Sequence, residues 1–418
     1  MADVLSDRLP LFPFRSPDDD PFTPVTAADR RRLDGPVTRV RLPTGGWTWL
    51  ITRHADVKAM LRSDAFSADM TRPGFPLLRQ APPPTPQSRR GSFIRMDGQE
   101  HLRMRRMLTG EFMIKNIRRI EPLITDVVDN ALDATEAAGR PADLVATFAL
   151  PVPSLVICHL LGIPYADHAF FQQRSAILLD QSADAARVRE AAAGLRTYIG
   201  TLIETKRTSG RPGDDLLGRL VTERVRTGEL EIGELIGMAM LLLIAGHETT
   251  ANMIGLSVLL LLQHPHAWHR LRTADDATAD DATVDDATVD TLVEELLRYL
   301  TIVRTGIPRQ AIHDVEIGGR LIRAGEPATA LLSLANRDND VFPAADEFDP
   351  YREAHQHLAF GFGVHQCIGQ PLARTELRIA LSRLAHRLPT LRLAKDPATL
   401  PKRDTSIVYG LAELPVTW

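Results

Sequence analysis

Cysteine is nearly absent from this chain, which has only Cys158 and Cys367 among its 418 residues. Two thiols cannot build a disulfide framework, so we expect a protein of the reducing cytoplasm. Positive charge is not in excess either, because the formal net charge is -4, and this argues against a nucleic-acid-binding protein. Residues 1–24 are rich in proline and aspartate and lack an apolar run. We therefore expect neither a signal peptide nor a membrane anchor there.

One long apolar stretch is present, at residues 236–262. His247, Glu248 and Asn252 fall in its middle, and a central charge costs about 2.5–3.5 kcal/mol in a bilayer. The stretch therefore predicts a long helix through a protein core, with its polar residues facing a cavity. It does not carry the zinc-protease motif H-E-x-x-H, since residue 251 is alanine.

The most informative segment runs from Phe360 to Gly369 and reads F-G-F-G-V-H-Q-C-I-G. Its glycines allow the backbone to approach a flat group, and Cys367 precedes a predicted helix at residues 370–388. The helix dipole and free backbone N–H groups favour a thiolate at such a position. A thiolate held rigidly there suits the axial ligand of a haem iron. A buried structural cysteine is the alternative for a lone thiol. A dinucleotide fingerprint is excluded, because Gln366 stands where the third glycine would be.

This spacing, F-G-x-G-x-H-x-C-x-G, resembles the haem-binding loop of the cytochrome P-450 family, the haem-thiolate monooxygenases. The resemblance spans nearly the whole chain and is to the soluble bacterial branch. Residues 294–301 and 357–374 are most similar to the actinomycete enzymes of secondary metabolism, including antibiotic biosynthesis, and of xenobiotic oxidation. The resemblance implies one domain over residues 1–418, with haem b buried between a long central helix and the helix after Cys367.

The polar centre of the apolar stretch, Ala245 to Thr250, resembles the oxygen-activation motif A-G-x-E-T-T of that family. The small pair Ala245 and Gly246 leaves room for dioxygen. A hydroxyl at Thr249 beside the carboxylate of Glu248 can pass protons through water. The alternative for Thr249 is a hydrogen bond back to the preceding helical turn.

Glu295 and Arg298 are three residues apart on a predicted helix and can therefore form an ion pair. An isolated pair of this kind usually lies on the surface and contributes little. In the family, E-x-x-R is instead an internal clamp completed by a further basic residue, and Arg352 matches that third position.

Haem propionates need cationic or hydrogen-bonding partners. His101 and Arg105 lie four residues apart on one predicted helical face, where the family has H-x-x-x-R for one propionate. Arg309 and His357 match two further propionate-binding positions, and His365 is another candidate. Within the cysteine loop, the resemblance makes Phe360, Gly361 and Gly369 part of the haem-binding segment.

The substrate side is expected to be formed by Ile302, Val303, Arg304 and Ile407, together with the proline-rich loop of residues 71–95, residues 170–198 and residues 241–245. Their mainly apolar character suits a sizeable hydrophobic molecule. Arg304 departs from that character, so it faces either a polar or anionic group of the substrate or the solvent.

The resemblance implies a reaction that inserts one oxygen atom from dioxygen into a C–H or C=C bond. Electrons would come from NAD(P)H through a separate ferredoxin reductase and ferredoxin to a monomeric enzyme. A local basic cluster is the expected docking surface for an acidic ferredoxin; it consists of Arg103, Arg106, Lys115, Arg118 and Arg119. Two alternatives keep the haem: an oxidase that forms rings, couples phenols or uses peroxide, and a non-catalytic haem sensor.

The remaining pattern predicts a mainly helical protein with a smaller β-rich part. Two hairpins are expected, at residues 37–52 and 315–322, because each has two β-prone runs joined by glycine-containing turns. Residues 273–290 contain three copies of Asp-Asp-Ala-Thr. A five-residue repeat fits neither helix nor strand, so this segment is expected to be a solvated insertion.

Overall fold

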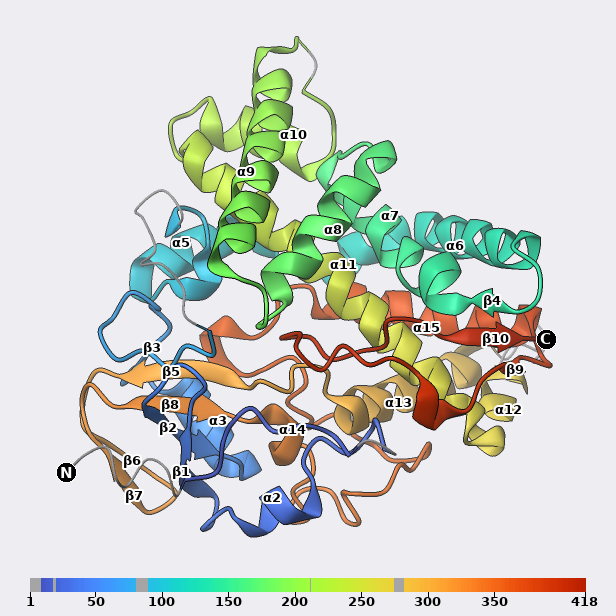
Figure 1. Ribbon diagram of the computed structural model, residues 1–418. Coiled ribbons are helices and arrows are strands. Elements are labelled where there is room, and N and C mark those ends of the chain that lie inside the picture. Colours follow the sequence, from blue (N-terminus) through green and yellow to red (C-terminus); the bar gives the residue numbers. More distant parts are fainter. Residues whose placement is uncertain (1–8, 18–19, 80–88, 211, 274–281) are drawn as a thin grey trace.

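The computed structural model describes residues 9–17, 20–79, 89–210, 212–273 and 282–418. Helices dominate this part of the chain, as expected (Figure 1). The α-helices are α2 (Ala27–Arg31), α3 (His54–Arg62), α5 (Gly98–Thr109), α6 (Ile114–Ala137), α7 (Pro151–Leu161), α8 (His168–Leu179), α9 (Ala185–Thr208), α10 (Leu216–Leu220), α11 (Ile232–Leu262), α12 (Pro265–Thr273), α13 (Ala282–Leu300), α14 (Leu332–Ala335) and α15 (Gln370–Arg387). Short helical turns are η1 (Phe93–Arg95), η2 (Val145–Ala149), η3 (Tyr165–Asp167), η4 (Val221–Val225), η5 (Gly363–His365) and η6 (Pro397–Thr399).

Most of the β-structure lies on one side of the molecule, around α3, and a small three-stranded sheet lies on the opposite side, next to the C-terminus (Figure 1). Its main sheet has the order β1-β2-β8-β5-β3, formed by β1 (Val37–Arg41), β2 (Trp47–Ile51), β8 (Pro327–Ala330), β5 (Ile307–Ala311) and β3 (Phe66–Ser67). Only the β2–β8 pair of this sheet is parallel. A separate hairpin joins β6 (Val315–Ile317) to β7 (Arg320–Ile322), and a small sheet contains β4 (Ala142–Asp143), β10 (Pro415–Thr417) and β9 (Arg392–Leu393). Both predicted hairpins are confirmed.

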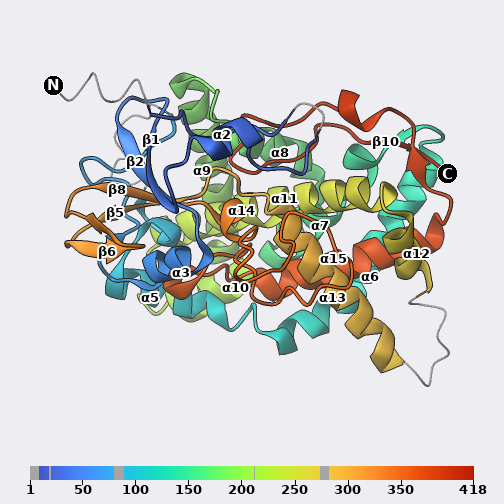
Figure 2. The ribbon, with the colours of Figure 1, turned by 90° about the horizontal axis from the view of Figure 1, so that it is seen from below.

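Helix α11 crosses the middle of the molecule in both views (Figure 1 and Figure 2). It begins with a capping box, in which the Glu231 side chain accepts from the third helical N–H and Glu234 accepts from the Glu231 N–H. The helix is long and apolar enough to cross a membrane. It packs instead against α7, α9 and α15, and its apolar residues are buried on most sides. A helix that is apolar all round is buried within a large core, which confirms the prediction from the sequence.

Helix α15, which follows Cys367, lies along α6 through a ladder of ion pairs. Arg378 pairs with Glu121 at 3.2 Å, Arg383 with Asp129 at 2.5 Å and Arg387 with Glu136 at 2.7 Å. These side chains are partly exposed, so each pair contributes little free energy. Together they set the register of α15 on α6, while the helix buries apolar residues such as Leu377, Leu381 and Leu384 beneath them.

The acidic repeat is only partly the insertion predicted. Residues 274–281 lie outside the described part of the chain, but residues 282–290 form the first half of α13. The expectation that the repeat fits no helix is therefore wrong for its last copy. The next turns of α13 bury Val289, Leu292 and Val293, and such packing overrides weak local preference.

Candidate functional site

The loop before Cys367 is folded by two glycines in the left-handed region. Gly361 has φ of +71° and Gly363 has φ of +74°, and a Cβ on Gly363 would lie 2.4 Å from the carbonyl oxygen of Leu61. Only glycine fits such a position without displacing α3. The Cys367 N–H donates to the carbonyl oxygen of Phe360 at 2.9 Å and closes the loop. This turn delivers the thiol to the beginning of α15.

The Cys367 thiol is accessible although protein surrounds it closely. Cys367 as a whole residue is exposed. Burial nevertheless raises the pKa of its thiol, and the backbone N–H groups of Gly369 and Gln370 and the nearby charge of Arg105 oppose that rise. Both observations hold together if the thiol faces an internal space rather than the outer surface. The helix terminus does stabilise the thiolate, as predicted, but burial outweighs it. A bound cation would tip the balance, because a coordinating thiol is deprotonated outright.

Basic side chains converge beside this thiol. The rings of His101 and His365 lie 4.1 Å apart, and Arg105 donates to the carbonyl oxygen of Gln366 at 2.6 Å. Burial, with nearby Arg95, lowers the pKa of Arg309 to about 10. Burial, followed by the charges of Arg309 and its neighbours, lowers the pKa of His365 to about 3. Burial also lowers the pKa of His101, so both imidazoles are neutral at pH 7.

This cluster fits a group with negative charge. The Nε2 atom of His101 is buried without a hydrogen-bond partner in the described part of the chain, and Arg309 is only 6% exposed. The guanidinium of Arg309 donates to the adjacent carbonyl of Pro308. Buried cations with so little compensation need an anion, and the propionates of a haem would supply it. The sequence analysis missed Arg95, whose side chain belongs to the same cluster. Its signal was an arginine three residues before the helix of His101.

His357 lies in a different set of contacts from the one predicted. Its Nε2 atom is 3.2 Å from a carboxylate oxygen of Glu294, which also pairs with Arg374 at 2.5 Å. These partners hold the pKa of Glu294 at about 2 against the opposing effect of burial. Glu294 of α13 therefore contacts both Arg374 of α15 and His357, and the imidazole beside His101 is that of His365. The sequence spacing alone could not separate these two histidines.

The middle of α11 combines an accessible position with a buried acid. Ala245 is exposed between buried residues of the same helix, which indicates an internal space beside it. Gly246 lies against Ile157, and a Cβ there would come within 2.9 Å of that side chain. The Thr249 hydroxyl donates to the Ala245 carbonyl at 2.6 Å, which is the local bond that the sequence left open. Glu248 is buried and pairs with Arg403 at 2.8 Å. Arg403 was not identified from the sequence.

Glu295, Arg298 and Arg352 are brought together as expected for an internal clamp. Arg298 is fully buried, and its guanidinium makes two bonds to Glu295 and three to the carbonyl oxygens of Asn336, Ala345 and Glu347. The Nε atom of Arg352 lies 3.3 Å from Glu295. All five N–H groups of Arg298 are thereby used, so this arginine fixes the segment that leads to the cysteine loop.

Arg304 faces neither a substrate nor solvent. It is buried, donates to Ser16 and to the carbonyl oxygen of Pro21, and lies 3.7 Å from the ring centre of Tyr409. The prediction that places it in a substrate pocket is therefore corrected: Arg304 ties the N-terminal segment to the C-terminal loop. The neighbouring Ile302, Val303 and Ile407 are half-buried. Ile302 accepts from the Tyr409 N–H, which places residues 302 and 407 on adjoining loops.

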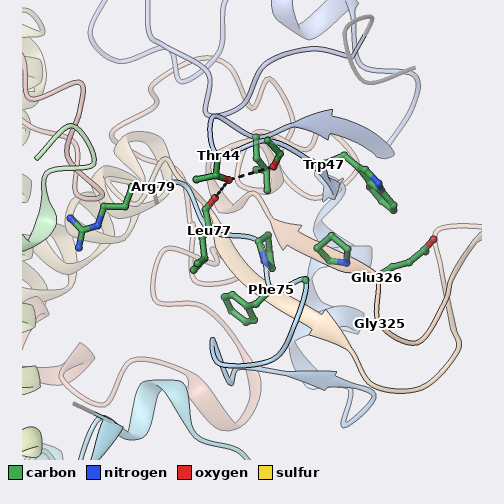
Figure 3. Close-up of a pocket in the computed structure, with 13 residues that line it drawn as sticks. Thr44, Trp47, Phe75, Leu77, Arg79, Gly325 and Glu326 are labelled. Carbon is green, nitrogen blue, oxygen red and sulfur yellow. Dashed lines mark hydrogen bonds between the residues drawn. The ribbon is translucent and has the colours of Figure 1, made fainter. Parts of the chain in front are cut away.

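A separate surface pocket of about 690 Å³ lies at the turn between β1 and β2 (Figure 3). Thr44, Trp47, Phe75, Leu77 and Glu326 are among its lining residues, and Thr44 donates to the Leu77 carbonyl at 2.7 Å. None of the residues predicted to bind haem or dioxygen lines it. The thiol, the basic side chains beside it and the accessible turn of α11 define the functional site better than this open pocket, because they carry the chemistry.

The sequence matches the family described as Cytochrome P450 over residues 29–402. It is 47% identical to "Cytochrome P450-SU2" of Streptomyces griseolus over 99% of this chain and 96% of that protein. It is 44% identical to "Pentalenic acid synthase" of Streptomyces avermitilis over 95% of each chain. The crystal structure of the mycinamicin VIII C21 methyl hydroxylase of Micromonospora griseorubida superposes with a TM-score of 0.87 at 36% identity, covering 98% of this chain and 100% of that one.

The chain therefore belongs to the cytochrome P450 family and is a haem-thiolate monooxygenase of the bacterial, actinomycete type. The mainly helical fold with a smaller β-rich part is the fold of this family, as the sequence predicted.

Proposed function

We propose that this enzyme inserts one oxygen atom from dioxygen into a sizeable hydrophobic molecule of secondary metabolism. The observation that carries the proposal is the accessible Cys367 thiol beside buried, uncompensated basic groups, together with an accessible turn of α11. The relatives support the substrate class, since one is named for pentalenic acid synthesis and a structural neighbour for hydroxylation of mycinamicin VIII.

Cys367 would bind the iron of haem b through its thiolate, and the haem propionates would be held by Arg95, His101, Arg105, Arg309 and His365. Haem bound to a thiolate supplies the activation of dioxygen. The chain supplies position and charge: the clamp around Arg298 fixes the segment before the loop, and the ladder of α6 and α15 fixes the helix after it.

Protons would be managed by Thr249 and Glu248. The Thr249 hydroxyl is a donor and acceptor on the accessible side of α11, and Glu248 is a buried carboxylate next to it. A hydroxyl freed from the Ala245 carbonyl would hold a proton on the accessible side of α11, and the Glu248 carboxylate would restore that proton through water.

Electrons would reach the haem from NAD(P)H through a ferredoxin reductase and a ferredoxin. Four residues of the basic cluster are exposed on α5 and α6: Arg106, Lys115, Arg118 and Arg119. Exposed Met113 and Ile114 add apolar area at the start of α6. An apolar centre with a charged rim is typical of a transient docking surface. Arg103 is also partly exposed, but its guanidinium pairs with Glu234 at the start of α11, so its charge is already partly compensated.

The experiment that tests the function is turnover under labelled dioxygen. The holoenzyme, a surrogate ferredoxin and reductase, and NADPH are supplied with the compound that gives the largest haem spectral change in a screen of hydrophobic metabolites. One labelled oxygen atom in the product supports insertion. An oxidised product without the label identifies a ring-forming or coupling oxidase, and no substrate-stimulated NADPH consumption identifies a haem sensor.

A further inference from the structure

The C-terminal hairpin of residues 402–411 contacts two parts of the proposed site. At its base, Lys402 and Leu411 form an antiparallel bridge, and the Arg403 N–H donates to the Gly410 carbonyl at 2.9 Å. At its tip, the Ile407 N–H donates to the carbonyl of Leu179, the last residue of α8, at 2.9 Å. Figure 1 shows this red segment beside the middle of α11 and below α8.

The base of the hairpin is seated on α11 by close contact. A Cβ on Gly410 would lie 1.7 Å from the Oδ1 atom of Asn252. Any residue larger than glycine would therefore clash with α11 at this position. Asn252 in turn donates to the Glu248 carbonyl at 2.7 Å. This seating brings the guanidinium of Arg403 to 2.8 Å from the Glu248 carboxylate.

The two partners of this ion pair differ in their freedom to move. The Glu248 side chain is 3% exposed and sits on a rigid helix, whereas the Arg403 side chain is 28% exposed and sits on a loop. Arg403 can leave the pair without being buried elsewhere, because water can receive its charge. Glu248 has no such exit. A second basic group, His247, faces the same carboxylate at 3.7 Å, but burial lowers the pKa of His247 and keeps it neutral.

In this structure both groups of the proposed relay are held by protein partners. Thr249 donates to the Ala245 carbonyl, and Glu248 is paired with Arg403. The release of Glu248 therefore depends on the position of the hairpin. The tip of that hairpin carries Ile407, which was predicted to contact the substrate, and Tyr409, whose N–H donates to the Ile302 carbonyl at 2.8 Å.

We propose that the hairpin of residues 402–411 couples occupation of the substrate pocket to the release of Glu248, with Arg403 as the positioning residue. A substrate that displaces Ile407 moves a short, hydrogen-bonded hairpin whose other end holds the acid. Proton supply would then follow substrate binding. This inference rests on the proposed function of Glu248 and Thr249, and it adds a residue that touches neither substrate nor cofactor.

The first test replaces Arg403 in the haem-loaded enzyme. If Arg403 holds Glu248 until substrate binds, Arg403→Gln should raise substrate-free NADPH oxidation by about three- to tenfold, with KM and the haem spectrum changed less than about twofold. Arg403→Lys keeps the charge and should restore at least half of the wild-type restraint on substrate-free NADPH oxidation. The matched control is Arg392→Gln, an exposed arginine on β9, which should behave as wild type. Wild-type substrate-free NADPH oxidation in Arg403→Gln, or no restoration with lysine, would overturn the proposal.

The second test measures the coupling itself. Arg403→Gln combined with Ile407→Ala should depart from the product of the two single effects on kcat by about threefold or more, because coupled sites are not additive. The control cycle pairs Arg403→Gln with Leu241→Ala, which removes a half-buried residue of α11, and it should be multiplicative. Multiplicative effects in both cycles would contradict the link through the hairpin.

A third measurement needs no turnover and no variant. Hydrogen exchange of the wild-type haem enzyme is followed at the amides of residues 403 and 412, with and without 4-phenylimidazole as a pocket-filling probe. Exchange at these amides should change by about fivefold or more on binding, since opening of a local unit governs exchange. Unchanged exchange there would overturn the proposal.

Thr249→Val separates a failure of the hairpin coupling from a failure of the proposed proton relay. If this variant leaves the peroxide yield unchanged, the relay itself fails, whatever Arg403 does.

Discussion

The cysteine side of the molecule and its substrate side use buried arginines in different ways. Arg298 donates all its N–H groups to one carboxylate and three carbonyls around the haem-binding segment, within a motif of fixed spacing. Arg304 is also buried, but it holds Ser16 and Pro21 of the N-terminal segment and stacks on Tyr409. The first arrangement serves a cofactor whose shape is constant, and the second serves loops that surround a variable molecule. Spacing motifs therefore identify the first and miss the second.

The largest effect is expected at the thiol. Cys367→His should abolish the strongly red-shifted Soret band of the reduced carbon-monoxide complex, because that band requires thiolate ligation. The measurement is the difference spectrum of the reduced protein with carbon monoxide. The matched control is Cys158→Ala, since Cys158 is buried on α7 and burial raises the pKa of its thiol to about 12. A normal band in Cys367→His would move the ligand elsewhere.

The two arginines give the next contrast. Arg298→Met should lower the free energy of unfolding of the holoenzyme by about 3–5 kcal/mol, because it leaves Glu295 as a buried carboxylate with only Arg352 nearby. Arg304→Met should cost about 1–3 kcal/mol, because it strands carbonyl and hydroxyl groups but no charge. Denaturant melts of both variants, with haem absorbance as a second probe, give the comparison. Equal losses would remove the distinction between the two sides.

A buried acid on α15 predicts how stability depends on pH. Burial raises the pKa of Glu376 to about 8, against a small opposing effect of Thr250 on α11. A carboxyl whose folded pKa lies above its unfolded value stays protonated in the native state, and its contribution is fully present only below pH 4.5. Unfolding free energy should therefore fall by up to a few kcal/mol between pH 5 and pH 8. Glu376→Gln should flatten this slope, as measured by denaturant melts at each pH. A slope identical to that of wild type would show that another group titrates.

On the oxygen side, Thr249→Val tests the proton donor. The substitution keeps shape but removes the hydroxyl, so haem content and electron uptake should remain while peroxide formed per NADPH rises severalfold and product falls. Glu248→Gln should instead slow turnover. The measurement is product and peroxide per NADPH with the identified substrate. Unchanged peroxide yield in Thr249→Val would place the proton source in ordered water or in the substrate.

The smallest effect is expected at the docking surface. Arg106→Glu with Arg118→Glu should weaken ferredoxin-driven reduction by about two- to fivefold, because oppositely charged partners are electrostatically steered. Haem content and substrate binding should not change, and rising salt should slow wild type more than the variant. Arg103→Glu is the contrasting variant: its loss should appear in stability, through Glu234, rather than in the salt dependence.

The sequence predicted most of the fold, because its elements follow from local periodicity and turn chemistry. Helix α11, α15 and both hairpins lie within a few residues of their expected bounds. It also predicted the cysteine loop and the clamp, since both are short-range patterns. It could not separate His357 from His365, because the difference lies in Glu294, which is distant in sequence. Arg95, Arg403 and the contacts of Arg304 were missed for the same reason: their partners meet only in three dimensions.

The basic side chains beside Cys367 have a consequence for how much of this enzyme a cell accumulates. Before haem arrives, Arg95, Arg105 and Arg309 repel one another in a poorly solvated site, so the newly made chain should be least stable at η1 and the start of α5. Cofactor binding then stabilises the folded chain by mass action. A host with limited haem synthesis should therefore lose the protein to proteases that cut near residues 93–105, and a supplied haem precursor should restore its yield.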